Sequence, residues 1–345
     1  MAPMSTSRDV ARMAGVSQST VSYVMSGKRP VAPETERRVR EAMAELGYRP
    51  HASARALKRH RSGIIGLVAP FHEDTDTAGQ YRYVVALAEA ARSRGYELLV
   101  ISGQEGIEGM ERLIGSALCE GILAMDVLHE DERVELARGA GLPCVFIGLS
   151  SQAEGVASTD TDFEEVGAAC VRLLAERGHR RIVMLNPASH RVAAMGFTHR
   201  FSTAVLEAAD REGVPVDVVE VARSYPAMAR ALDVLTARGG PQEAFLVAPG
   251  VSADDLVNVL HHRGAVVGRD VSVVAARGSG RAPHSPVDCT CFDADVDAVA
   301  ATAVRLLIDQ LDPRAPRTHS PVLVPAVFRP GASLAPPPRE GGPAL

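Results

Sequence analysis

The chain has 345 residues, of which 46% are hydrophobic and 23% are charged, and its formal net charge is −5. A chain of this length and apolar content can bury a large core in two or three domains, which excludes a small disulfide-stapled scaffold. The charge is uneven, because residues 1–62 hold 12 Lys and Arg against 5 Asp and Glu, whereas the remainder holds 25 against 37. A basic end on an acidic body is suited to binding a polyphosphate through that end.

The sequence also indicates the cellular compartment in which the protein is expected. No apolar run follows Met1, and nowhere do 18 apolar residues occur without a charge, so we expect no signal peptide, no membrane span and a cytoplasmic protein. Five scattered cysteines, mostly in apolar surroundings, predict buried thiols in a reducing compartment. No His or further Cys stands at ligand spacing from Cys289 and Cys291, so we expect neither a metal site nor a cofactor.

Residues 8–24, RDVARMAGVSQSTVSYV, predict two short helices joined by a tight turn. Gly15 ends the first helix because it allows a left-handed turn. Ser17 is placed to cap the second helix, whose apolar back contains Val21. Its polar front consists of Gln18, Ser19, Ser22 and Tyr23. This pattern is typical of a helix-turn-helix that offers one helix to the major groove, and the alternative is a pair of bundle helices with a solvated face.

A third helix and a linker follow. Pro33 suits the first turn of a helix that Gly47 ends, which completes a headpiece of residues 1–49. Residues 50–62 are basic, have little apolar surface apart from Leu57, and cannot fold on a core of their own. Their alanines favour helix, so this linker is expected to become helical when its charges are neutralised.

From Ile64 onward, short apolar strands alternate with amphipathic helices. We expect strands near residues 64–69, 97–101, 121–125, 144–148, 181–185, 216–221, 244–248, 271–275 and 322–327. Such alternation predicts two parallel sheets covered on both faces, with a ligand cleft at the carboxyl ends of the strands. Residues 331–345, which include APPPREGGPAL, are expected to form a disordered tail.

The order of these parts resembles the LacI/GalR (lactose and galactose repressor) family of bacterial transcription regulators. The motifs that carry the resemblance are DVARMAGVSQSTVSYVMSG, ETERRVREAMAELGYRPHASARAL, IIGLVAP, LLAERGHRRIVML and RDVSVV. The resemblance implies a homodimer whose protomers carry a small all-α helix-turn-helix headpiece, a hinge helix and an α/β core similar to periplasmic binding proteins. Three crossings would join two lobes, the first containing residues 63–158 and 290–314 and the second residues 159–289 and 315–330. The helix at 295–311 would return to the first lobe, and the final strand to the second.

The resemblance also implies which side chains meet DNA. Gln18, Ser19 and Tyr23 fall on its base-reading positions; glutamine pairs bidentately with adenine, and hydroxyls at a helix start hold phosphate oxygens. Leu57 matches a leucine that relatives wedge into the minor groove, the alternative being a surface leucine in a linker. Many relatives carry Arg at the position of Tyr23 and Asn at that of His51. The residues expected at the DNA are Ser7, Ser17, Gln18, Ser19, Thr20, Ser22, Tyr23, Ser26, Thr35, Tyr48, His51, Ala54 and Leu57.

The expected cleft departs from the pattern of the sugar-binding relatives. They usually carry Asn-Asp after the strand at 244–248 and an Asp after the strand at 271–275, whereas this chain has Pro249-Gly250 and Ala275-Ala276-Arg277. We therefore expect an effector other than a simple neutral sugar, such as an anion facing Arg277, or none. The alternative is that shifted loops supply equivalent groups from Asp254, Asp255 or Asp288. The residues expected at the cleft are Phe71, Asp162, Arg200, Pro249, Arg277 and Phe292.

Together these features predict a sequence-specific transcriptional regulator that binds a near-palindromic operator and is tuned by a small molecule. A repressor is favoured because most relatives repress, and an activator or an effector-independent regulator is the alternative. The missing export signal argues against a solute-binding protein. The sequence has no GxSxG motif, no phosphate-binding glycine loop and no recognisable nucleophile–base pair, which argues against an enzyme. His179, in RGHRR, is expected at a helix end, where a cation suits the dipole.

Overall fold

The computed structural model describes residues 5–26, 29–48, 62–69, 72, 76–102, 106–238, 244–277, 287–316 and 319–335, and only the backbone of residues 26, 102, 238 and 277. The chain forms two compact units, Met1–Ser62 and Gly63–Leu345. Within the described residues, no helix has both the length and the apolar content needed to cross a membrane.

The described residues of the first unit form three helices, α1 (Ser7–Ala14), α2 (Gln18–Ser26) and α3 (Pro33–Glu45). The predicted turn is confirmed, because Gly15 caps α1 with a φ of +64° and the Thr20 amide donates to Ser17 Oγ at 3.1 Å. Pro33 opens α3 as predicted. One fully buried valine from each helix forms the centre of the core: Val10, Val21 and Val39.

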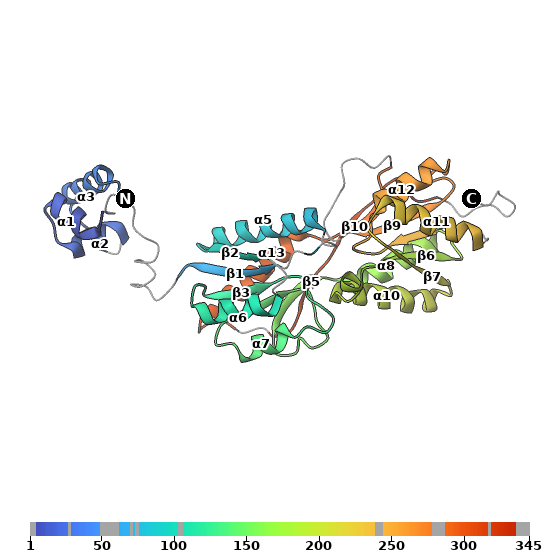
Figure 1. The fold of residues 1–345 in the computed structure, drawn as a ribbon, viewed down its shortest axis with the longest axis horizontal. Coiled ribbons are helices and arrows are strands. Elements are labelled where there is room, and N and C mark those ends of the chain that lie inside the picture. Colours follow the sequence, from blue (N-terminus) through green and yellow to red (C-terminus); the bar gives the residue numbers. More distant parts are fainter. Residues whose placement is uncertain are drawn as a thin grey trace. The chain divides into compact units, whose positions relative to one another are not determined.

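The first lobe of the second unit is a six-stranded parallel sheet with strand order β11-β5-β4-β3-β1-β2 (Figure 1). Its strands are β1 (Ile64–Ala69), β2 (Glu97–Ser102), β3 (Gly121–Ala124), β4 (Cys144–Ile147), β5 (Ala157–Thr161) and β11 (Val322–Val324). Helices α5 (Thr77–Ser93) and α13 (Val296–Leu311) pack on one face. Helices α6 (Gly106–Ser116) and α7 (Arg133–Gly139) pack on the other. Both faces are therefore covered, as the apolar strands require.

The second lobe repeats this plan with strand order β12-β10-β9-β8-β6-β7. Its strands are β6 (Ile182–Pro187), β7 (Val216–Val221), β8 (Ala244–Val247), β9 (Ser272–Arg277), β10 (Thr290–Asp293) and the antiparallel β12 (Val327–Arg329). Helices α8 (Phe163–Glu176) and α10 (Gly196–Glu212) cover one face. Helices α11 (Tyr225–Arg238) and α12 (Ala253–His262) cover the other, and the short helix α9 (His190–Ala193) follows β6.

The chain crosses between the lobes three times, and α13 returns to the first lobe, as predicted. The boundaries differ at three places, one of which is that residues 159–161, expected in the second lobe, belong to β5 of the first lobe. The expected final strand at 322–327 is two strands, of which β11 joins the first lobe and β12 the second, because Pro325 between them interrupts the run and cannot donate to a ladder. Residues 290–293, expected in the first lobe, form β10 beside β9 in the second.

Two segments have more structure than their composition predicts. Residues 157–161, ASTDT, lack an apolar run, yet they form the fully buried strand β5 between β4 and β11. Residues 331–335, expected in the disordered tail, are ordered against the second sheet. The Ser333 hydroxyl donates to the Val273 carbonyl at 2.5 Å, and the Ala335 amide donates to Ser272 Oγ at 2.8 Å.

Candidate DNA interface and ligand cavity

Helix α2 presents an uncharged polar face. Gln18, Ser19 and Tyr23 are exposed, whereas Val21 on the opposite side is fully buried. The Gln18 side-chain amide donates to Ser7 Oγ at 2.7 Å, which fixes the plane of the amide and leaves its oxygen and second N–H available. The face therefore has the bidentate donor and acceptor geometry that reads adenine in a major groove.

Hydroxyl groups gather at the start of α2. Ser17 Oγ lies 2.7 Å from Ser19 Oγ and 2.8 Å from Thr20 Oγ1. Ser17 and Ser19 are exposed, and Thr20 is half-buried. A helix N-terminus with exposed hydroxyls is suited to holding a phosphate oxygen.

An arginine that the sequence analysis did not single out lies beside Tyr23. The Arg29 guanidinium carbon is 5.8 Å from the centre of the Tyr23 ring, within the range of a cation–π contact. Arg29 therefore brings a cation to the position where many relatives carry arginine.

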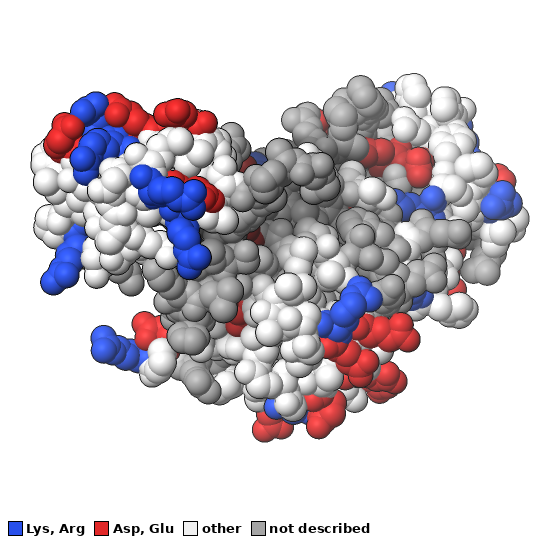
Figure 2. All heavy atoms as spheres, turned by 60° about the vertical axis from the view of Figure 1, so that its left-hand side comes forward, with Lys and Arg blue, Asp and Glu red and all other residues white. Residues whose placement is uncertain are grey.

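Charge elsewhere in the described headpiece is nearly balanced. Residues 5–26 and 29–48 hold six Arg and five acidic residues, and on α3 Arg37 pairs with Glu34 at 2.6 Å and Arg40 with Glu36 at 2.7 Å. Figure 2 likewise shows many basic side chains beside acidic ones on the face that it displays. The basic surplus of residues 1–62 comes mainly from residues 49–61, which lie outside the described residues.

The second unit contains a cavity of about 160 Å³ between its two lobes. The first lobe contributes α5, the residues that follow β3 and β4, and β5. The second lobe contributes the first turn of α8, α9, the start of α10 and the residues that follow β7 and β8. Most of these segments are at the carboxyl ends of parallel strands, which is where the sequence analysis expected a cleft.

The lobes are in direct backbone contact beside this cavity. The Gly196 amide donates to the Val127 carbonyl at 2.9 Å, and the His129 amide donates to the Ala194 carbonyl at 2.7 Å. A side chain at Gly196 would overlap the carbonyl oxygen of Leu149 in the first lobe. The close approach of the two lobes therefore requires glycine at this position.

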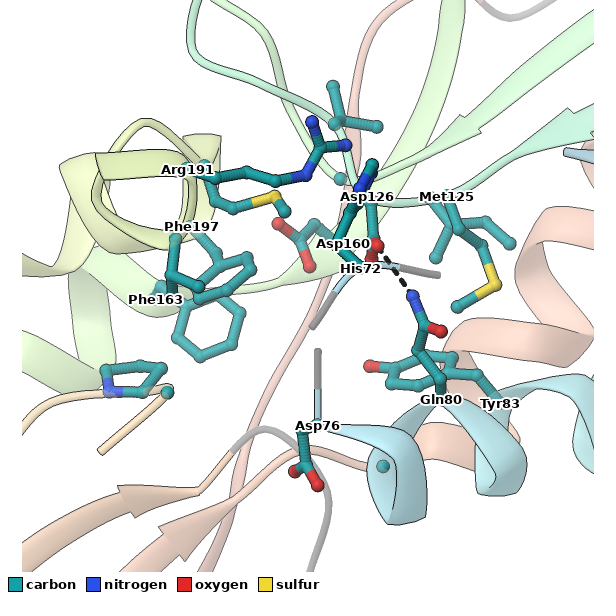
Figure 3. Close-up of a pocket in the computed structure, with 18 of the residues that line it drawn as sticks. His72, Asp76, Gln80, Tyr83, Met125, Asp126, Asp160, Phe163, Arg191 and Phe197 are labelled. Carbon is teal, nitrogen blue, oxygen red and sulfur yellow. Dashed lines mark hydrogen bonds between the residues drawn. The ribbon is translucent and has the colours of Figure 1, made fainter. Parts of the chain in front are cut away.

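The first-lobe wall presents Asp126 in a strained conformation. Asp126 has a φ of +53°, and its Oδ2 accepts a hydrogen bond of 2.6 Å from Gln80 Nε2 (Figure 3). Arg133 supports this loop by donating to the Met125 carbonyl at 3.0 Å and the Asp126 carbonyl at 2.9 Å. Burial raises the pKa of Asp126 to about 6, although Arg133 and Arg191 oppose that shift. Strained residues with perturbed pKa values are typical of ligand sites.

A second carboxylate of the cavity is already neutralised. Asp160, on β5, forms an ion pair with Arg200 of α10, and Arg200 also pairs with Glu164 at 2.6 Å. Burial nevertheless raises the pKa of Asp160 to about 6. Arg200 is therefore committed to holding β5 and α8 together.

The second-lobe wall combines a cation with aromatic rings. Arg191 reaches the cavity from α9, and Figure 3 shows it extending towards the side on which Asp126 lies. The Phe163 and Phe197 rings line the same wall with centroids 5.6 Å apart. Arg223 also lines the cavity and pairs with Asp76 of the first lobe at 2.9 Å. An apolar wall with a few convergent polar groups is characteristic of small-molecule sites.

Comparisons with known proteins agree with this geometry. Residues 6–51 match the family described as "Bacterial regulatory proteins, lacI family", and residues 158–334 match "Periplasmic binding protein-like domain". This chain belongs to the lacI family. The transcriptional regulator CelR of Thermobifida fusca is 29% identical over 312 residues, covering 88% of this chain and 90% of CelR. Catabolite control protein A of Priestia megaterium is 24% identical and covers 87% of this chain and 90% of its own length.

Solved structures show the same fold. A CelR–cellobiose complex superposes with a TM-score of 0.68 at 25% identity, covering 95% of this chain and 99% of the other. The Lac repressor dimer bound to operator and the anti-inducer ONPF superposes with a TM-score of 0.83 at 22% identity, covering 96% and 100%. A lacI-family protein is a transcriptional regulator rather than an enzyme, as the sequence analysis predicted.

Several residues expected at the DNA interface of this lacI-family chain are half-buried or lie outside the described residues. Tyr48 is half-buried and packs against the headpiece core, which indicates a structural role. Ser7, Ser22 and Thr35 are half-buried. The side chain of Ser26 and residues His51, Ala54 and Leu57 lie outside the described residues.

Of the residues expected at the effector cleft, Pro249 lines the cavity. Three others are not among the residues that line it. Asp162 caps α8 by accepting from the Glu165 amide at 3.0 Å, Arg200 is paired with Asp160, and the Phe292 ring packs on Phe328 with centroids 5.0 Å apart. Phe71 and the side chain of Arg277 lie outside the described residues.

The acids proposed as substitutes also lie away from the cavity. Asp254, Asp255 and Asp288 are not among the residues that line it. Among the described residues, the carboxylates that line it come from the first lobe: Asp76, Asp126 and Asp160. Arg191 was missed by the sequence analysis, which assigned Arg200 to the cleft instead.

His179 differs from its predicted role as a cation at a helix end. It follows the end of α8, but its side chain is 2% exposed and its Nε2 lies 2.8 Å from Ser272 Oγ. It therefore links the end of α8 to β9 inside the second lobe. The five cysteines are buried and free of disulfides, as predicted.

Proposed function

We propose that this protein is a repressor that binds a near-palindromic operator as a homodimer, and that a small molecule in the interlobe cavity sets its operator affinity. The observation that carries the proposal is the outward face of α2, where Gln18, Ser19 and Tyr23 are exposed over a fully buried Val21. Membership of the lacI family supports the same function.

Base recognition in this proposal uses neutral groups. Gln18, held by Ser7, offers its remaining N–H and its oxygen to adenine, and a bidentate pair of this kind discriminates against a wrong base by about 1–3 kcal/mol. The Ser17 and Thr20 hydroxyls hold phosphates at the helix start. Non-specific affinity comes mainly from the basic residues 49–61.

A homodimer follows from the size of one headpiece, since a single recognition helix reads only a few base pairs and two copies read a site with two-fold symmetry. The Lac repressor, whose fold this chain shares, was solved as a dimer on its operator. The resemblance also assigns Leu57 to the operator centre as an apolar wedge in the minor groove.

The small-molecule effector of this repressor binds in the cavity between the lobes. A ligand that contacts both walls stabilises one arrangement of the lobes over others, which is what coupling to DNA affinity requires. We retain the expectation that simple neutral sugars are not effectors. It is supported by Pro249 and Gly250 at the cavity and by the cation Arg191 on the same wall.

Footprinting of the purified chain on the DNA upstream of its own coding sequence tests the proposal. We expect protection of one near-palindromic site, and about a tenfold or greater loss of affinity for it in Gln18→Ala. Glu45→Ala, at the exposed end of α3, is the matched control and should bind like the wild type. Equal binding of Gln18→Ala and wild type to a protected site would contradict the assignment of α2 as the reading helix.

A further inference from the structure

Arg191 stands out among the arginines around the cavity because it has no hydrogen-bond or ion-pair partner in the described part of the chain. Its Nε is buried and has no hydrogen-bond acceptor among the described residues, and none of their carboxylates lies within the 4.0 Å of an ion pair. By contrast, Arg223 pairs with Asp76, Arg200 with Asp160, and Arg133 with Asp131. A buried N–H donor without an acceptor is costly, so the place of this Nε on a cavity wall calls for an acceptor from a ligand.

The carboxylate that acts on Arg191 most strongly is Asp126, on the opposite lobe. Asp126 is held by Gln80 and stays beyond ion-pair distance of Arg191. The two groups line the same cavity from different lobes, so one ligand in the cavity can contact both (Figure 3).

Among the carboxylates and arginines that line the described part of the cavity, Arg191 and Asp126 are the two that have no ion-pair partner. Asp76 is neutralised by Arg223 and Asp160 by Arg200. Asp126 accepts from an amide and is ready to accept from further donors. A hydroxyl suits Asp126, whereas the charged and partly desolvated Arg191 is satisfied best by an anion with two oxygens. The Phe163 and Phe197 rings supply an apolar surface beside both groups.

We infer that the effector is a small hydroxylated anion, whose carboxylate or phosphate group binds Arg191 and whose hydroxyl donates to Asp126. This inference rests on the proposed function, because it names the class of effector for the same cavity. Arg191 is then the residue that selects anionic over neutral ligands, and Arg277 is not needed for that role.

Thermal shift and calorimetry on the full-length protein test the inference with four probes: glucose, gluconate, glucose 6-phosphate and inorganic phosphate. We expect at least one of the three anions to raise the melting temperature saturably, and glucose to have no effect. The anions distinguish the two possible ligand groups, because binding of gluconate indicates a carboxylate site and binding of glucose 6-phosphate or inorganic phosphate indicates a phosphate site.

Variants separate the cavity from other anion-binding surfaces of the protein. Arg191→Gln should weaken binding of the active anion at least tenfold, Arg191→Lys should restore part of it, and Arg230→Gln, on the exposed face of α11, should leave it unchanged. Stabilisation that persists in Arg191→Gln, an equal response to glucose, or no response to any anion would overturn the inference.

Operator binding without any ligand is measured in parallel. If all variants bind operator DNA but no anion acts through Arg191, the inference fails and the proposed function stands. If the wild type does not bind DNA specifically, the proposed function itself fails.

Discussion

Asp76 of the first lobe and Arg223 of the second form an ion pair of 2.9 Å beside the cavity that both line. Asp76 precedes the first turn of α5 and Arg223 follows β7, so this contact joins elements that are 147 residues apart in the chain. Both side chains remain partly exposed, at 31% and 42%.

Removing this pair should alter ligand binding more than stability. A partly exposed ion pair contributes about 0.2–1 kcal/mol to folding, so Arg223→Gln should unfold almost like the wild type. Because the pair spans the lobes, we expect a several-fold loss of affinity for any ligand that both lobes contact. Arg172→Gln, which breaks a pair with Glu165 within the second lobe, is the control and should change neither. Unaltered ligand affinity in Arg223→Gln would show that the pair does not hold the lobes together.

Removing a buried ion pair should cost more stability than removing the partly exposed pair of Asp76 and Arg223. Arg133 and Asp131 pair at 2.7 Å with side chains only 7% and 3% exposed, and Arg133 also holds two carbonyls beside Asp126. Burial alone would raise the pKa of Asp131, but the hydrogen bonds and charge of Arg133 outweigh it and hold this pKa below its usual value. Arg133→Met should lower the free energy of unfolding by about 3–5 kcal/mol, because it leaves a buried carboxylate uncompensated.

Urea unfolding measures the stability lost in Arg133→Met, and Arg305→Met is the control. Arg305 forms an exposed pair with Asp309 at 3.3 Å, so its loss should cost less than about 1 kcal/mol. Equal effects of the two substitutions would show that burial does not decide the energetics of the Arg133 pair.

The contribution of Asp126 to the free energy of unfolding should depend on pH with a sign opposite to that of most carboxylates. Burial raises its pKa in the folded protein from 3.8 to about 6, so the folded state binds its proton more tightly than the unfolded chain. The free energy of unfolding therefore decreases as pH rises through this interval and stays lower above it. Asp126→Asn removes the penalty and tolerates the positive φ, so it should be more stable at pH 7.5 by on the order of 1–3 kcal/mol.

The control for this prediction is Asp270→Asn. Hydrogen bonds from Arg269 and the Val266 amide lower the pKa of Asp270 to about 2. Asp270 therefore adds stability above its ordinary pKa, which is lost as pH falls through the folded value, and its substitution should destabilise the protein at pH 7.5. Asp126→Asn and Asp270→Asn should thus shift the melting temperature in opposite directions, and shifts of the same sign would contradict the assignment.

The headpiece was predictable from the sequence because its signals are local. Gly15, Ser17 and Pro33 act within one turn of their own position, and valines at helical spacing mark the buried side. The alternation of strands and helices likewise predicted two parallel sheets, whereas the three crossings were implied by the family resemblance.

The sequence predicted where the cavity lies but not most of the residues that line it. Its lining comes from many separate elements, so no single stretch of sequence contains its pattern. Arg191 was not predicted, because it reaches the cavity from the short helix α9, which the sequence analysis did not foresee. Strand β5 was missed because its polar side chains find partners only in the folded sheet, as Thr159 does with the Val322 carbonyl and Asp160 with Arg200.

Leu57 lies outside the described residues, and its proposed role makes a distinct prediction. Leu57→Ala should weaken specific operator binding by about 1–3 kcal/mol and leave binding to random duplexes nearly unchanged, because a wedge acts only at the kinked centre. Lys58→Ala is the control and should weaken both kinds of binding alike, with a smaller salt dependence. A salt titration on both duplexes measures this, and equal losses for Leu57→Ala on the two would count against a wedge.

Sequence-specific operator binding by this protein is tested most directly by selection from a pool of random DNA duplexes. The full-length protein at physiological salt should enrich one near-palindromic sequence and bind it at least about 10³-fold more tightly than a scrambled duplex of the same length. Failure to enrich any sequence, or equal affinity for the selected and scrambled duplexes, would contradict the account.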